Sequence, residues 1–154
     1  MLDIWNSVNK SEDIEALLAF YGGFHDSCIK ELKYVSGMKV NDEKIMLFGE
    51  AKDRHVSIIF QRQWDPVTIE LYFLGLRRMS IAGWQRNYLN EINNCYLALR
   101  NDLIAGMDDD MIVWADHTGF NPKDSFERNY LAEPMTSFII ADKLLWRETQ
   151  CISG

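Results

Sequence analysis

A histidine–aspartate pair lies within the segment Phe20 to Ser27, where the chain passes from an expected helix to an expected strand. An imidazole beside a carboxylate can act as a general base or bind a metal, with Ser27 or Cys28 as the nearest nucleophile. Adjacent side chains of a strand point to opposite faces, so His25 and Asp26 share one site only where a turn or bulge reorients them. The structural alternative is that His25 bonds to the backbone while Asp26 caps a turn.

A second pair, Asp116-His117, follows a predicted strand, and two such pairs would supply two imidazoles and two carboxylates to a metal ion. The chain has no local ligand spacing such as His-Glu-x-x-His, no phosphate-binding glycine loop and no Gly-x-Ser-x-Gly nucleophile turn. We therefore expect no enzyme, no catalytic residue, no metal and no cofactor. A small metal-dependent hydrolase that uses His25, Asp26, Asp116 and His117 is the less favoured alternative.

The chain is acidic, with 23 Asp and Glu side chains against 16 Lys and Arg and a net charge of −7. This charge argues against nucleic acid or an anionic membrane as a partner and favours a basic protein. Asp108, Asp109 and Asp110 form the most acidic run and lack the donor pattern of a calcium loop. They are interpreted as a solvated turn or as contacts to a basic partner.

Five tryptophans are many for 154 residues, and their positions separate them. Trp114 and Trp146 lie in strand patterns, which predicts that they are buried, and Arg147 is placed to stack on Trp146. Trp64 and Trp84 lie beside turn residues, so we expect them to be partly exposed. Because tryptophans often anchor interfaces, these two join Asp108–Asp110 as candidate partner-binding residues.

Cys28, Cys95 and Cys151 are far apart in the sequence and lack the short paired spacing of a zinc or redox site. The first ten residues do not show the basic and apolar regions of a secretory signal, and no apolar run reaches the roughly 20 residues of a membrane span. These features predict free thiols and a cytoplasmic protein without membrane contact. With no repeat or linker, we expect a single domain over residues 1–154.

The spacing of apolar residues along the sequence predicts the helix and strands that must position these side chains. Apolar residues at helical spacing predict a helix over 11–20, with Ser11 as its N-cap and Gly22-Gly23 as its end. Alternating residues predict strands at 55–60 and 67–73, and further strands at 111–116 and 137–146; in the last, Phe138, Ile140, Leu144 and Trp146 should share one face. The spans 28–36 and 43–51 are expected to pair as a hairpin, whereas 88–105 is ambiguous between helix and strand, with a strand favoured for 94–100. The predicted fold class is α+β, mainly β, with one twisted, mostly antiparallel sheet and an N-terminal helix.

The order of these pieces resembles a group of small bacterial proteins. The likeness rests on Phe24-His25-Asp26 at the opening of the first long strand and on Ala141, Leu144 or Leu145, Trp146 and Arg147 in the last, and it spans residues 10–148. The group comprises domains of unknown function, some classed as immunity proteins of polymorphic toxin systems. The Asp-rich stretch at 101–110 departs from its pattern. The resemblance implies a non-enzymatic binding protein whose partner is a toxin.

Together these features predict a protein-binding domain, with an immunity protein that neutralises a basic toxin as its specific form. The remaining alternative is a homo-oligomeric structural or ligand-binding domain, in which the uncovered face of the sheet pairs with that of a second copy.

Overall fold

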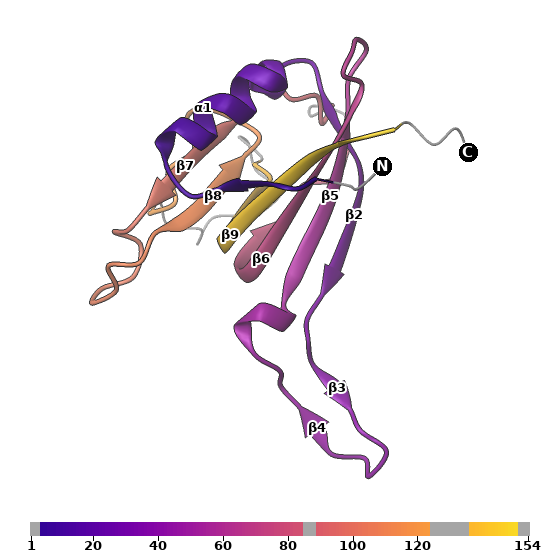
Figure 1. Cartoon of the computed structure of the whole chain (residues 1–154), viewed down its shortest axis with the longest axis vertical. Coiled ribbons are helices and arrows are strands. Elements are labelled where there is room, and N and C mark those ends of the chain that lie inside the picture. The colour runs from indigo at the N-terminus through magenta and orange to yellow at the C-terminus, as the bar shows by residue number, and fades with distance from the viewer. Residues whose placement is uncertain (1–3, 85–88, 124–135, 151–154) are drawn as a thin grey trace.

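Among the residues that the structure describes, one α-helix and one large antiparallel sheet make up most of the fold (Figure 1). The computed structural model describes residues 4–84, 89–123 and 136–150. The sheet order is β2-β5-β6-β9-β8-β7, and β1 pairs with β9 outside this path. The predicted class, mainly β with an N-terminal helix, is confirmed.

No helix in the described ranges is both long enough and apolar enough to span a bilayer. The bounds are β1 Asn6–Val8, α1 Ser11–Phe20, η1 Gly22–Phe24, β2 Cys28–Val35, β3 Lys39–Val40, β4 Met46–Leu47, η2 Ala51–Asp53, β5 His55–Gln61, β6 Thr68–Ser80, β7 Tyr96–Arg100, β8 Met111–Ala115 and β9 Phe138–Thr149.

The helix α1 has the predicted length, but its N-cap is Lys10 rather than Ser11. The Asp13 carboxylate accepts hydrogen bonds from the backbone N–H groups of Asn9 (2.9 Å) and Lys10 (3.1 Å), which favours a helix start one residue earlier. At the other end, Gly22 and Gly23 have φ of +58° and +65°, a conformation that stops the helix as expected.

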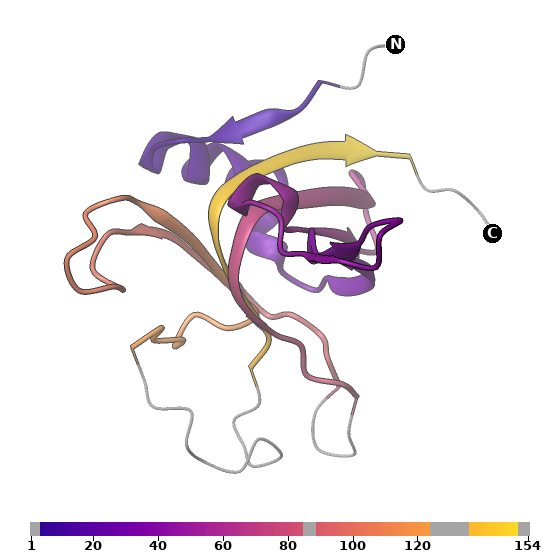
Figure 2. The ribbon, with the colours of Figure 1, turned by 90° about the horizontal axis from the view of Figure 1, so that it is seen from below.

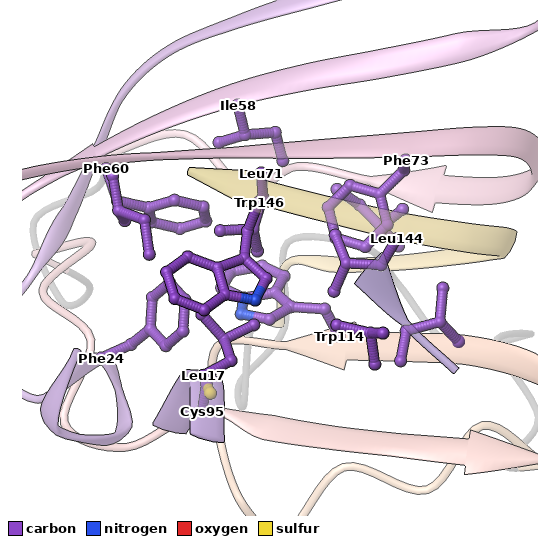
Figure 3. Packing of buried hydrophobic residues seen from close by; sticks show 14 of the residues in the cluster. Leu17, Phe24, Ile58, Phe60, Leu71, Phe73, Cys95, Trp114, Leu144 and Trp146 are labelled. Atoms are coloured by element: carbon purple, nitrogen blue, oxygen red, sulfur yellow. The ribbon is translucent and has the colours of Figure 1, made fainter. Parts of the chain in front are cut away.

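The strands predicted at 55–60 and 67–73 are confirmed as β5 and β6, which pair with each other in antiparallel register, and their alternation is confirmed. Every second side chain is fully buried, and these residues are Val56, Ile58, Phe60, Ile69, Leu71 and Phe73. Helix α1 packs against this face of the sheet through Ile14 and Leu17. Trp114 and Trp146 are buried in the same core, as predicted, with the Trp114 ring 5.2 Å from that of Phe60 (Figure 3).

The long strands β6 and β9 change the face that they present to the core at the same level of the sheet. Phe73 and Leu144 are cross-strand partners in the core, and Leu76 and Ala141 are the next core pair, which shifts the alternation by one residue on both strands. Gly75 adopts φ +69° at this point, and Figure 2 shows both strands curving together. The prediction that Phe138, Ile140, Leu144 and Trp146 share a face is therefore wrong: Phe138 and Ile140 pack in a separate cluster with Phe120.

The sequence 94–100 contains strand β7, as favoured, but the predicted hairpin of 28–36 with 43–51 is wrong. Strand β2 pairs with β5, placing Leu32 opposite Ile58. The intervening residues instead form a separate two-stranded sheet, β3 and β4, that extends away from the main sheet (Figure 1). Strand β5 is the better partner because its regularly alternating buried face continues the half-buried side chains of β2, whereas 43–51 contains only two strand residues.

Arg147 stacks on Trp5, 4.3 Å from the ring centroid, and not on its neighbour Trp146. It also pairs with Glu70 at 2.9 Å. Trp146 points into the core, where its ring lies 4.9 Å from that of Phe20. Consecutive strand residues face opposite sides of the sheet, which excludes the predicted stacking of adjacent side chains.

Candidate functional site

The Phe24-His25-Asp26 motif forms a tight left-handed junction between α1 and β2. Gly22, Gly23, Phe24 and Asp26 all have positive φ, between +55° and +65°. Phe24 is fully buried, and its ring packs 5.0 Å from those of Tyr21 and Phe60. A non-glycine residue adopts this conformation only where its surroundings compensate for the strain. At Phe24 the aromatic core provides that compensation, so this member of the motif is structural.

The turn at Asp26 brings the two polar side chains of the motif together. His25 Nε2 lies 3.3 Å from Asp26 Oδ2, and both side chains are well exposed, at 51% and 40%. The other ring nitrogen, Nδ1, forms a hydrogen bond with the Asn93 backbone carbonyl. The Asp26 backbone N–H donates to the Ile92 carbonyl at 2.7 Å. The backbone role predicted for His25 is confirmed, and the motif ties the start of β2 to residues 92–93.

The neighbouring nucleophile candidates are not arranged for attack. Ser27 is buried, and its hydroxyl donates to the Phe24 carbonyl at 2.6 Å. Cys28 is exposed at the start of β2. Cys95 is buried, and that burial raises the pKa of its thiol to about 12, although hydrogen bonds to the backbone and then to Trp114 lower it in part. A thiol with so high a pKa is a poor nucleophile at neutral pH.

The second polar pair approaches the same segment from another side. His117 forms a parallel bridge with Asn94, and its Nδ1 accepts a hydrogen bond from the Gly119 N–H at 2.8 Å. Asp116 is buried, and its backbone N–H donates to the Ser137 carbonyl. The structure thus brings His25, Asp26 and His117 to residues 92–94, whereas the backbone of Asp116 pairs with Ser137. Within the described ranges, however, no three His, Cys, Asp or Glu side chains lie close enough together to hold a metal ion.

The predicted partner-binding residues are exposed but lie in three separate places. Asp108, Asp109 and Asp110 lie in the connection between β7 and β8. Trp64 and Trp84 are 43% and 69% exposed, which confirms their expected exposure. Trp64 precedes β6 and Trp84 follows it, so the whole of that 13-residue strand separates them. They do not form one patch.

A group of exposed apolar side chains lies where the sequence patterns did not indicate a surface. We call residues 36–54, which connect β2 to β5, the arm. Lys39 pairs with Leu47 and Val40 with Met46, and continuing this register places Met38 opposite Phe48. Cross-strand partners and residues two apart share a face. One face of the arm therefore consists of four side chains that are each 47–71% exposed: Met38, Val40, Met46 and Phe48.

Specific contacts give the arm a defined shape at its turn. Lys44 N–H donates to the Asn41 carbonyl at 2.9 Å, and Lys44 itself has φ +64°. Hairpins with three-residue loops commonly contain such a turn followed by a residue in the left-handed conformation. The Asn41 side chain accepts two further hydrogen bonds, from the Glu43 and Ile45 backbone N–H groups. The tip of the arm is therefore held by its own backbone and by Asn41.

The base of the arm is a narrow waist where two glycines allow the backbones to touch. A Cβ atom on Gly49 would lie 2.6 Å from the Gly37 carbonyl oxygen, and one on Gly37 would lie 2.7 Å from the Asp53 Cβ. The Asp53 carboxylate accepts a hydrogen bond from the Glu50 N–H at 2.8 Å. These contacts orient the arm relative to the sheet from which it extends. The sequence signal was present in Gly37, Gly49 and the apolar run 45–48, but the same signal also describes an ordinary buried hairpin.

No family model matches this chain, and comparison with curated proteins and with solved structures returned no significant match. The resemblance through Phe24-His25-Asp26 therefore remains a prediction.

Proposed function

We propose that this chain is a non-enzymatic protein-binding domain that inserts the arm into an apolar groove of a partner protein. The observation that carries the proposal is the continuous apolar face formed by Met38, Val40, Met46 and Phe48 on an element that extends away from the main sheet (Figure 1). Exposed apolar patches on folded proteins mark interaction surfaces more often than isolated exposed residues do. The arm would then recognise its partner by apolar packing and without a catalytic step.

The shape of the arm supports this function because it is formed before binding. The waist and turn already fix the backbone, so little conformational entropy is lost when a partner closes on it. Full burial of a large apolar side chain contributes about 1.5–3 kcal/mol. Because each of the four side chains is still 47–71% exposed, the arm offers several kcal/mol of apolar transfer free energy by the same measure.

Charge separates the arm from the rest of the domain. Residues 36–54 contain four basic and four acidic side chains and are neutral, so the net charge of −7 belongs to the body. A partner whose groove is apolar and whose rim is basic would match both parts. A basic toxin neutralised by an immunity protein belongs to this class of partner and is our specific proposal for the biological role.

The proposal is tested by copurification from cells of the source organism, with the partner identified by mass spectrometry. The wild type is compared with Phe48→Ser and with a control, Leu89→Ser, because Leu89 is 67% exposed and lies outside the arm. We expect the wild type and the control to retain the same protein and Phe48→Ser to lose it. Equal retention by all three chains would contradict the proposal.

A further inference from the structure

Strand β2 forms an edge of the main sheet. It pairs with β5 on one side, and no strand of the described ranges lies on its other side (Figure 1). The register of β2 against β5 shifts between Ile29 and Glu31 and is regular from Glu31 to Val35. Along this regular part, the outer backbone N–H and C=O groups of the edge strand can pair with another strand. It contains no proline that would block such pairing.

We propose that a second copy of this chain pairs with β2 in an antiparallel register in which Leu32 faces Leu32 across a two-fold axis. The two sheets would then join into one continuous sheet through a symmetric seam. This seam lies on β2 and does not involve the apolar face of the arm, so the inference stands or falls independently of the proposed function.

The charges along β2 select this register. In antiparallel pairing, the side chains of opposite residues point to the same face of the sheet. In a symmetric pair, one residue must therefore lie opposite its own copy at the two-fold axis, and each alternative register places a different residue there. With Leu32 at the centre, Glu31 of each copy faces Lys33 of the other, which forms two opposite-charge pairs. A shift by one residue in either direction places Glu31 opposite Glu31 or Lys33 opposite Lys33. Like charges directly opposite each other destabilise a sheet.

The local structure leaves these two side chains available for the seam. Glu31 lies beside Ile59 and Lys33 beside Ser57 on β5, and both are exposed on the face of the sheet that points away from the core. Neither takes part in an ion pair among the described residues. Leu32 is half-buried on the core side, where a second copy would cover it further.

Lysines on an edge strand commonly prevent pairing, because a strand rich in one sign of charge repels its copy. On β2 the sign alternates, from Lys30 and Glu31 to Lys33, and the alternation is self-complementary in the register centred on Leu32. The same charges that discourage shifted registers therefore specify one. In this dimer the two arms lie at opposite ends of the seam, one for each copy.

The test uses charge reversal and mixing, measured as mass in solution by sedimentation equilibrium over a dilution series. We expect the wild type to form dimers, and Glu31→Lys and Lys33→Glu each to weaken the dimer by about 10- to 100-fold, because each places like charges at both pairs. In an equimolar mixture of the two variants every pair is again opposite in charge. The mixture, and the double variant E31K/K33E, should therefore regain the dimer, which a merely misfolded chain would not do.

A monomeric wild type, single variants that dimerise as well as the wild type, or a mixture that stays monomeric would each overturn the inference. Phe48→Ser should leave the dimer unchanged. If Phe48→Ser abolishes the dimer while both charge variants keep it, the arm and not β2 joins the copies, and this proposal fails while the arm remains an interaction element.

Discussion

Two connections between neighbouring strands extend from the sheet and differ in charge and in exposed apolar side chains. The arm joins β2 to β5, and residues 101–110, here called the acidic tip, join β7 to β8. The arm is neutral and presents four apolar side chains on one face, whereas the acidic tip contains four aspartates and no basic residue. Buried apolar contacts mainly determine how long a complex lasts, and charge at a rim mainly determines how fast it forms. The two elements are suited to different stages of binding.

The two connections are also stabilised differently. The arm depends on backbone contacts at the Gly37–Gly49 waist. The acidic tip depends on side chains at its base, where Arg100 and Lys123 pair with Asp102 at 2.8 and 3.1 Å. Backbone packing keeps an apolar element in shape without covering it, while ion pairs hold a charged loop that stays in water.

The largest effect should come from the arm itself. Once a partner is identified, Phe48→Ser should weaken binding by about 100-fold, mainly through faster dissociation, because it removes a central aromatic contact. Ile104→Ser, in the acidic tip, is the control and should change affinity little. Surface plasmon resonance gives both rates, and equal effects of the two substitutions would remove the distinction between the two elements.

A smaller effect should follow from disturbing the waist without touching the apolar face. Gly49→Ala forces a Cβ against the Gly37 carbonyl at φ +71°, so the arm must tilt, and we expect about a tenfold loss of affinity. Gly106 in the acidic tip is the matched control because it also has a positive φ, +82°, but has open space around it. If Gly106→Ala weakens binding as much, orientation of the arm is not the cause.

The acidic tip should affect the rate of association only. Replacing Asp108, Asp109 and Asp110 together by Asn should slow association about two- to fivefold at low salt, provided that the partner is basic. The dissociation rate should stay the same, and added salt should reduce the difference between the two proteins. Stopped-flow association at two ionic strengths measures this, and an on-rate indifferent to salt and to the substitutions would exclude electrostatic steering by the tip.

The smallest effect concerns the ion pairs at the base of the tip. Hydrogen bonds from Arg100 and then Lys123 hold the pKa of Asp102 well below its usual range. Because folding lowers the pKa of Asp102, its carboxylate stabilises the folded state fully at pH values above the usual aspartate pKa. This stabilisation is lost only as the pH falls below that value. An NMR titration of the Asp102 carboxyl should show this low midpoint, and an ordinary midpoint would contradict the geometry. Because the group is exposed, Asp102→Asn should barely change the melting temperature.

The regular part of the fold could be predicted because its local and long-range preferences agree. In β5 the alternation of Val56, Ile58 and Phe60 requires a strand with one buried face, and that is what the structure contains. The curvature of β6 and β9 could not be predicted, since it depends on Gly75 meeting Asp142 across two strands that are far apart in sequence. A shift of one residue at that level moved Phe138 and Ile140 to the other face.

For the candidate sites, the sequence could predict which side chains are exposed but not which side chains come into contact. Turn residues beside Trp64 and Trp84 indicated their exposure correctly. The His25–Asp26 contact depends on the positive φ of Asp26, which no sequence pattern indicates. The apolar run 45–48 predicts a strand equally well whether it is buried or exposed, because local sequence does not state which surface will cover it.

The central claim, that the arm is the principal contact, is tested most directly by site-specific photo-crosslinking in cells. A photoreactive phenylalanine analogue would replace Phe48 in one protein and Leu89 in the other, since the two side chains are similarly exposed, at 71% and 67%. We predict a covalent adduct with one partner protein from position 48 and none from position 89. An adduct from position 89 alone, or none from position 48, would contradict the account.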